Sequence, residues 1–326
     1  MAKAKQTSGS AAQKRNQARQ QRQERLDREK VYPKGGGRRG KKANNPWPMV
    51  IGILVMCIVV VGAFVWLSTR QTSGTSAAVL KSITHMDQNL LETVGTGTAQ
   101  SSFKAIPASA SIPKGATGKP LFLYMGADYC PYCAAQRWSA IIALSRFGSF
   151  GPIDQLTSSE TSVPTFTFHN VKYTSNYIDF AGLETTDNNN NTLDVPTAEQ
   201  SKLFSTYDSP PFTTTQNAGA IPFILVGKQV ESGAFYSPQL LVGLSYDQIN
   251  SKLLDSTSDI SRGMLGTANY LTAAICQATN NQPGNVCTSV IQSIEKGLPQ
   301  PAKAMAGTQQ FAVAGKLPDM IVRKQD

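Results

Sequence analysis

The fold class follows from residues 121–133, which run Leu121-Phe122-Leu123-Tyr124-Met125-Gly126-Ala127-Asp128-Tyr129-Cys130-Pro131-Tyr132-Cys133. Their first five side chains are apolar or aromatic, a pattern typical of a short strand buried on both faces. The chain then turns into a Cys-x-x-Cys motif, and apolar residues recur after it at helical spacing until Gly148. The stretch therefore predicts a buried strand that leads directly into a helix, with two cysteines at the helix N-terminus.

The Cys-x-x-Cys motif predicts thiol–disulfide chemistry. At a helix N-terminus, unpartnered backbone N–H groups and the helix dipole both stabilise a thiolate. A lower thiol pKa makes a cysteine a better nucleophile and a better leaving group. We expect Cys130 to be the exposed attacking thiol and Cys133 the buried resolving thiol, because two intervening residues let the second sulfur reach the first. Pro131 fits the first helical turn, since it has no N–H to lose.

Two other uses of the motif stay open, a zinc site and a purely structural disulfide. A zinc site needs two further ligands at compatible spacing. The other candidates are Cys276 and Cys287, which have ten residues between them, and two isolated histidines, His85 and His169. Because these residues form no zinc pattern, no metal and no cofactor is expected.

A second apolar run, Ile221-Pro222-Phe223-Ile224-Leu225-Val226, predicts another strand, which a Gly-Lys turn joins to a strand at 229–236. Together with residues 121–133 and the helix after them, this run resembles the thioredoxin superfamily over residues 119–237. The resemblance implies that Pro222 is a cis proline that faces the cysteines and leaves a backbone edge free for an extended substrate. The residues expected to contact substrate are Ile221, Pro222, Pro131 and Tyr132. An ordinary trans proline that opens the strand is the alternative.

The part of the chain after residue 70 is also similar to an uncharacterised family of membrane-anchored thioredoxin-like proteins from archaea and some bacteria. The resemblance implies an α/β, thioredoxin-like fold with an insertion near 148–215 and a C-terminal helical extension. Helical segments are expected at 238–255, 261–279 and 285–297. Thioredoxins carry a buried acid six positions before the first cysteine, and that position is Tyr124 here. The departure favours an oxidase or isomerase over a reductase.

Residues 47–67 contain no charged residue, and 21 residues of helix extend about 30 Å, the thickness of a bilayer's hydrocarbon core. Trp47 and Trp66 stand near the two ends, where indole rings favour the membrane interface. These features predict a single transmembrane helix before the α/β domain. Basic residues crowd its N-terminal side, so the positive-inside rule puts the N-terminus in the cytoplasm and the C-terminal domain outside the cell membrane.

The net charge of +10 is confined to the N-terminal segment. Residues 1–45 contain 14 Lys and Arg against three acids, which leaves 17 bases and 18 acids in the rest of the chain. The basic tail has few apolar residues, so we expect it to be disordered or a solvated helix and to serve membrane topology, with no nucleic-acid partner. The domains expected are a tail at 1–46, the membrane helix at 47–67, a linker with one amphipathic helix at 68–118, the α/β domain at 119–298 and a tail at 299–326.

Cys276 and Cys287 form a second candidate pair. The residues between them, Asn280-Asn281-Gln282-Pro283-Gly284-Asn285, predict a turn that folds two helices back on each other. A domain outside the cytoplasm is exposed to oxidising conditions, so a structural disulfide is expected. A second redox pair that exchanges electrons with Cys130 is the alternative.

These features predict a membrane-anchored thiol–disulfide oxidoreductase that acts on exported cysteine-containing proteins and is recharged by an unknown redox partner. Two alternatives from other functional classes stay open. One is a non-catalytic binding or chaperone-like module with the same fold. The other is a copper metallochaperone, in which His169 would supply a third ligand beside the two thiolates.

Overall fold

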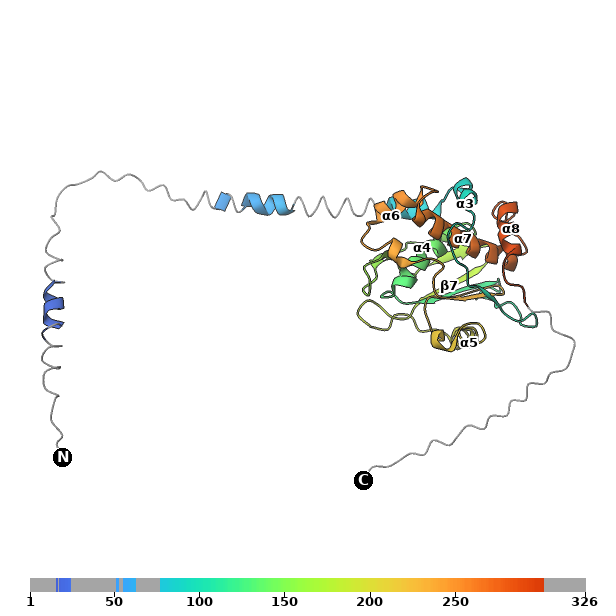
Figure 1. Cartoon of the computed structure of the whole chain (residues 1–326), viewed down its shortest axis with the longest axis horizontal. Helices are drawn as coiled ribbons and strands as arrows, with labels where there is room; N and C mark the ends of the chain where they lie inside the picture. The colour runs from blue at the N-terminus through green and yellow to red at the C-terminus, as the bar shows by residue number, and fades with distance from the viewer. Residues whose placement is uncertain (1–15, 17, 25–50, 53–54, 63–76, 302–326) are drawn as a thin grey trace, which may run out of the picture. The chain divides into compact units, whose positions relative to one another are not determined.

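The computed structural model describes residues 16, 18–24, 51–52, 55–62 and 77–301 (Figure 1). Contacts divide the chain into two units, Met1–Phe64 and Val65–Asp326. The described residues of the first unit are helical. Most of the predicted tail at 1–46, and the part of the predicted C-terminal tail after residue 301, lie outside the described residues.

The structure contradicts the single transmembrane helix predicted at residues 47–67. Within this span, residues 51–52 and 55–62 are helical and exposed, and the others lie outside the described residues. Among the helices that the structure describes, none is long and apolar enough to cross a membrane. A membrane-spanning helix needs about 20 consecutive apolar residues, more than the described residues of this segment supply.

A five-stranded sheet forms the centre of the second unit. Its strand order is β1-β9-β8-β2-β7. The predicted strand, β2, is the fourth in this order, and it pairs in parallel with β7 and antiparallel with β8. The bounds of the strands are β1 Lys104–Ala105, β2 Leu121–Gly126, β7 Asp179–Glu184, β8 Phe223–Val226 and β9 Gln229–Ser232.

Helices cover both faces of this sheet, as Figure 1 shows. Alternate side chains of β2 point to opposite faces, as strand geometry requires. Phe122 and Tyr124 belong to the larger core on the side of α4 (Pro131–Ser145), whereas Leu123 and Met125 belong to a smaller core. Partly buried residues of α5 (Ala198–Tyr207) pack against that smaller core. All six residues of β2 are therefore buried, which explains the uninterrupted apolar run in the sequence.

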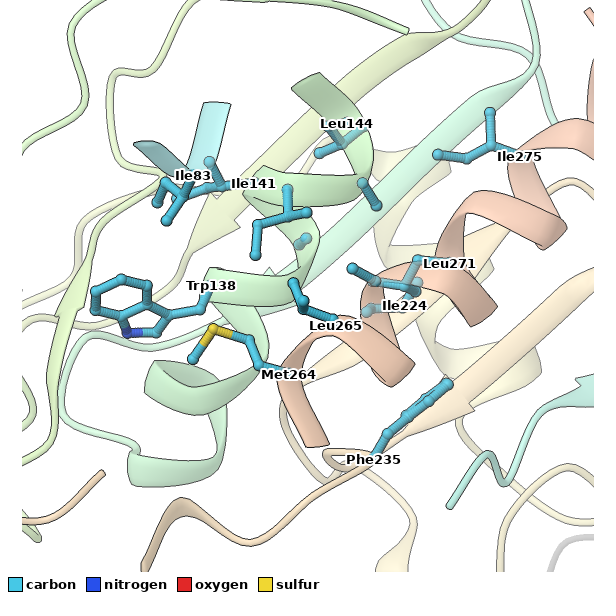
Figure 2. Close-up of a cluster of buried hydrophobic side chains, with 14 of the residues drawn as sticks. Ile83, Trp138, Ile141, Leu144, Ile224, Phe235, Met264, Leu265, Leu271 and Ile275 are labelled. Atoms are coloured by element: carbon cyan, nitrogen blue, oxygen red, sulfur yellow. The ribbon is translucent and has the colours of Figure 1, made fainter. Parts of the chain in front are cut away.

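The long helix α7 (Asp259–Ala278) packs against α4 in the larger core. Figure 2 shows Trp138, Ile141 and Leu144 of α4 beside Met264, Leu265, Leu271 and Ile275 of α7. The other C-terminal helices are α6 (Tyr246–Leu253) and α8 (Ser289–Lys296), with a 3₁₀ turn at Pro238–Leu240. The helical C-terminal extension is therefore present, with α6 shorter than the segment expected at 238–255.

The region between α4 and β8 is built mostly from short strands. Its elements are β3 (Gly148–Phe150), β4 (Gln155–Thr157), β5 (Pro164–Phe166), β6 (Tyr173–Ser175), β7, α5 (Ala198–Tyr207) and a 3₁₀ turn at Thr215–Asn217. β3 pairs with β6 and β4 pairs with β5, both antiparallel. The indole of Trp138 donates to the carbonyl of Pro164 at 2.9 Å, and Thr165 donates to the carbonyl of Ala134 at 2.7 Å. These bonds fix β5 against the N-terminal half of α4.

The segment before β2 packs into the same core. Residues 77–84 are helical, and α3 (Gln88–Val94) follows after a break at residues 85–87. Asp87 caps α3 through a bond from the Leu90 N–H, which explains why the amphipathic pattern over 77–93 divides into two helices. The chain from residue 77 onward thus combines helices and strands, the mixture expected for the α/β class.

Candidate functional site

Cys130 caps the N-terminus of α4, directly after the turn that follows β2. Its backbone is extended, with φ −78° and ψ 123°, and Pro131 occupies the first helical turn. The Sγ atom of Cys130 accepts the backbone N–H of Cys133 at 3.3 Å. Both cysteines are free thiols in the structure. Cys130 is 6% exposed and Cys133 is fully buried, so Cys130 is the less buried of the two but is not the exposed thiol that the sequence predicted.

This geometry shifts the pKa values of the two thiols in opposite directions. The pKa of Cys130 is lowered, first by the hydrogen bond from the Cys133 thiol, and further by backbone N–H groups and the charge of Arg137. Burial raises the pKa of Cys133 well above its usual value, and its bond to Cys130 raises it further. Cys130 therefore ionises first, while Cys133 keeps its proton.

The sequence-predicted residues Ile221 and Pro222 lie beside Cys130. The thiol of Cys130 lies 3.8 Å from the carbonyl oxygen of Ile221, to which it donates. The peptide bond between Ile221 and Pro222 is cis. The carbonyl of Pro222 accepts the N–H of Gly233 at 2.8 Å, which fixes the segment against the end of β9. The structure thus brings together residues that are 91 positions apart in the sequence.

A buried aspartate, Asp208, contacts the chain just before Ile221. The carboxylate of Asp208 accepts the hydroxyl of Ser232, and its backbone carbonyl accepts the N–H of Gly219 at 3.3 Å. Burial raises the pKa of Asp208, and the hydrogen bond from Ser232 opposes that shift. Because Gly219 lies two residues before Ile221, Asp208 helps to position the backbone that faces Cys130. No sequence pattern predicted a role for this aspartate.

Sequence analysis also missed an ion pair behind the motif, between Arg137 of α4 and Glu184 of β7. Two contacts of 2.8 Å join the side chains, from Nε to Oε1 and from Nη2 to Oε2, and both residues are fully buried. Nη2 of Arg137 also donates to the carbonyl of Ala127 at 2.6 Å. Arg137 follows Cys133 by one helical turn. The ion pair therefore ties α4 to β7 and to the turn before Cys130.

Further polar groups extend this network toward the surface. Asp128 lies 3.7 Å from Nη2 of Arg137, and the backbone N–H of Glu184 donates to Asp194 at 2.9 Å. Asp194 in turn contacts Nδ1 of His169 at 2.8 Å. His169, the third copper ligand considered above, is thus bonded to a carboxylate. In the part of the chain that the structure describes, no group of three or more His, Cys, Asp and Glu residues could hold a metal ion.

Tyr124 of β2 stands six positions before Cys130. It is fully buried, and its hydroxyl donates to the carbonyl of Cys133 at 3.5 Å. Burial raises the pKa of the phenol well above its usual value, so Tyr124 is neutral. The buried carboxylate that acts on Cys133 is Glu184 of β7, which is paired with Arg137.

The surface around the motif has two hollows. Tyr132 is 53% exposed and borders a hollow of about 630 Å³. Its other lining residues are Thr98, Gln100, Ser101, Ser102, Ala234, Phe235, Tyr236, Ser237 and Leu240. A second hollow of about 370 Å³ is lined by Tyr129, Ser159, Glu160, Asn188 and Asn190. The residue before Cys130 and the residue before Cys133 thus each face an open, largely polar surface.

Cys276 and Cys287 form a disulfide between α7 and the loop that precedes α8. The S–S distance is 2.00 Å and the Cα atoms are 5.7 Å apart. Cys276 is fully buried and Cys287 is 2% exposed. This pair is therefore enclosed by protein.

The site is a pair of free thiols at a helix N-terminus in an α/β domain, with a cis peptide bond beside the first sulfur. Residues 111–277, just over half of the chain, match the model of a family described as a domain of unknown function (DUF929). The chain belongs to this family. The matched residues include both motif cysteines, Ile221 and Pro222. No curated protein and no solved structure matches the chain.

Proposed function

We propose that this chain is a thiol–disulfide oxidoreductase with a thioredoxin-like domain, which acts on exported cysteine-containing proteins. Cys130 is the nucleophile and Cys133 is the resolving thiol. One observation carries the proposal. Cys130 accepts an N–H bond at the N-terminus of α4 and has a lowered thiol pKa, while Cys133 is fully buried behind it. A thiolate at a helix N-terminus with a more deeply buried partner thiol is an arrangement suited to disulfide exchange.

In the reducing direction, the Cys130 thiolate attacks one sulfur of a substrate disulfide. A Cys130–substrate S–S bond forms as the substrate's own S–S bond breaks, and the released substrate thiolate takes a proton from solvent. Cys133 then loses its proton and attacks Sγ of Cys130. This step forms the Cys130–Cys133 disulfide and releases the second substrate thiol. The same steps in reverse oxidise a substrate dithiol.

The second step needs a way to deprotonate a thiol whose pKa burial has raised. Arg137 lowers the pKa of Cys133 by its charge, whereas Glu184 raises it. Tyr124 is neutral and donates its hydroxyl to a carbonyl. No unpaired carboxylate among these groups accepts the proton of Cys133. This environment favours release of substrate from Cys130 over resolution by Cys133, which suits an oxidase or isomerase more than a reductase.

The arrangement of the sheet and the site supports the thioredoxin-like assignment. A central strand, β2, leads into the cysteine-bearing helix, pairs in parallel with β7 and is followed across the sheet by the antiparallel strands β8 and β9. The Ile221 carbonyl faces the Cys130 thiol. An extended substrate would pair with the backbone at Ile221, and Tyr132, which is exposed, would contact it. Pro131 and Pro222 are buried and shape this surface from below.

The disulfide between Cys276 and Cys287 supports a location where disulfides persist. Such bonds form in oxidising compartments and are rare in the cytosol. Substrates that meet the enzyme there are exported proteins whose cysteines need to be paired correctly. An unidentified redox partner in the same compartment would restore Cys130 and Cys133 after each cycle.

The reduction potential of the Cys130–Cys133 pair tests this proposal. The full chain is equilibrated with glutathione buffers, and the fraction of oxidised protein is measured by thiol trapping. A potential above roughly −200 mV indicates a disulfide donor or isomerase, and one near −270 mV indicates a reductant. A pair that never forms a disulfide at any buffer ratio contradicts the proposal, and a non-catalytic binding module is then the better explanation.

Matched serine variants separate exchange from simple oxidation of the protein. Cys133→Ser should accumulate a mixed disulfide with a cysteine-containing peptide, because the resolving thiol is missing. Cys130→Ser should form none, since Cys133 is buried. Equal trapping by the two variants contradicts the roles assigned to the two cysteines.

A further inference from the structure

Asn190-Asn191-Thr192 is the one Asn-x-Ser/Thr sequence, with x other than proline, in the whole chain. This tripeptide is the acceptor signal for N-glycosylation, and the signal is used only on exported proteins at exposed sites. The motif is short enough to arise by chance. Whether this tripeptide can be glycosylated therefore depends on its position in the fold.

The tripeptide belongs to the loop that follows β7 and runs from its turn to its closing bridge. The bridge between Thr186 and Thr192 closes the loop. Asn190 has a φ of 65°, a left-handed conformation that asparagine tolerates better than most residues. Asn190, Asn191 and Thr192 are all exposed. The acceptor amide and the hydroxyl that the signal requires are both accessible on the folded domain.

The shape of this loop is set by neighbours of Asn190. Asp187 accepts the backbone N–H groups of Asn189 and Asn191 and the side-chain amide of Asn191. Asn188 accepts the N–H of Ser159 at 3.1 Å and donates to the carbonyl of Thr157 at 2.9 Å. Asn188 and Asn191 thus use their amides to hold the loop. A substituent on the Asn190 amide would leave these bonds intact.

We propose that Asn190 is an N-glycosylation site. The donor is an oligosaccharide linked through phosphate to a membrane lipid. The Asn190 amide nitrogen forms a bond to the anomeric carbon of the first sugar and loses a proton, while the bond from that carbon to the lipid phosphate breaks and the phosphate leaves with the lipid. The inference goes beyond the proposed exchange activity and shares with it only the exported location.

The glycan would stand at the edge of the catalytic site. Asn190 lines the hollow of about 370 Å³ to which Tyr129 and Glu160 also contribute. Tyr129 directly precedes Cys130, and the backbone N–H of Glu160 donates to its carbonyl at 3.3 Å. A sugar on Asn190 therefore occupies the Tyr129 side of the site and leaves the hollow beside Tyr132 open to substrate.

Mass spectrometry of the full chain, purified from the organism that makes it, tests the proposal. Trypsin cleaves after Lys172 and Lys202 and releases residues 173–202, which contain the whole loop. Electron-transfer fragmentation should locate a saccharide on Asn190. Thr192→Ala, expressed in the same cells, should lose it, because the acceptor signal is broken at an exposed side chain. Asn189→Gln, the matched control, should keep it, because the signal is intact.

Two results would overturn the inference: a wild-type peptide 173–202 found only without sugar, or a saccharide that persists in Thr192→Ala. Correct folding of each variant is checked by thiol counting, since the Cys276–Cys287 disulfide leaves two of the four cysteines after residue 70 unreactive. Loss of exchange activity does not change the mass of the peptide. The glycosylation site and the proposed function can therefore fail independently.

Discussion

The guanidinium of Arg137 contacts the carboxylate of Glu184 at two points, each 2.8 Å long, and neither side chain reaches solvent. The same guanidinium holds the Ala127 carbonyl at 2.6 Å, three residues before Cys130. Because Arg137 belongs to α4 and Glu184 ends β7, the ion pair fixes the strand-to-helix turn that carries Cys130. It sits too deep to meet substrate, so its role is to position the turn and to set the charge behind Cys133.

Removal of one partner of this ion pair should destabilise the fold strongly. Glu184→Gln leaves the Arg137 charge buried without a counter-charge, and we expect a loss of about 3–5 kcal/mol in the free energy of unfolding. Urea denaturation measures this loss. Arg137→Met combined with Glu184→Leu should recover most of it, because no buried charge remains.

An exposed ion pair in the same domain provides the control. Lys119 lies 3.8 Å from Asp179, and the Lys119 side chain is 32% exposed. Lys119→Met should cost less than about 1 kcal/mol, since solvent screens such ion pairs. A similar loss for Glu184→Gln and Lys119→Met would mean that the buried ion pair has no special role.

The pH dependence of alkylation should reveal the lowered pKa of Cys130. Only the thiolate reacts with iodoacetamide, so the rate for reduced protein should reach half its maximum below the value of about 8.5 for an ordinary cysteine. Cys133→Ala removes the thiol hydrogen bond that contributes most to the shift, so the midpoint should move to higher pH. Peptide mapping should find Cys133 unlabelled in folded protein. An unchanged midpoint in Cys133→Ala contradicts this origin of the shift.

The parts of the fold that the sequence predicted best are those where the signal is local. The apolar run and the helical spacing around the motif predicted a strand at 121–125 and a helix after Cys130, and the structure has β2 at Leu121–Gly126 and α4 at Pro131–Ser145. No local sequence signal predicts the pairing of Arg137 with Glu184. These residues are 47 positions apart, and neither belongs to a recognisable motif.

The short strands and the apolar run at 47–67 show where sequence patterns fail to predict the structure. β3, β4 and β6 have three residues each, too few for an alternating pattern to appear. Their stability comes from antiparallel pairing, β3 with β6 and β4 with β5, and from the packing of β3 and β5 on α4, which only the folded chain reveals. The run at 47–67 met the composition of a membrane span, but its described residues do not supply a helix long enough to cross one.

The disulfide between Cys276 and Cys287 should stabilise the domain without taking part in exchange. Its cysteines are 11 positions apart, and closing a loop of this size contributes about 3 kcal/mol. Cys276→Ser with Cys287→Ser should therefore lower the free energy of unfolding by about this amount and leave exchange by Cys130 unchanged. Unfolding curves and a peptide exchange assay measure the two effects. A loss of exchange in a folded variant would instead indicate a second redox pair.

Glu231 of β9 is a buried carboxylate, and few hydrogen bonds or charges compensate for its loss of hydration. It is 2% exposed, its Oε1 accepts the Ser102 hydroxyl, and its Oε2 has no hydrogen-bond partner among the described residues. Burial raises the pKa of Glu231 to about 8. The nearby charge of Lys104 and the Ser102 bond only partly oppose this shift. The folded protein thus holds a proton on Glu231 at pH values where the unfolded chain has released it.

The domain should therefore lose stability as pH rises. A raised pKa in the folded state gives stability that is fully present below the unfolded value of about 4.3 and is lost as pH rises through the folded value. Between these limits Glu231 contributes a slope of about −1.4 kcal/mol per pH unit to the free energy of unfolding. Glu231→Gln cannot ionise, so urea denaturation of this variant from pH 5 to 8 should lack that slope. Parallel pH profiles for the variant and the wild type would show that Glu231 is already ionised in the folded protein.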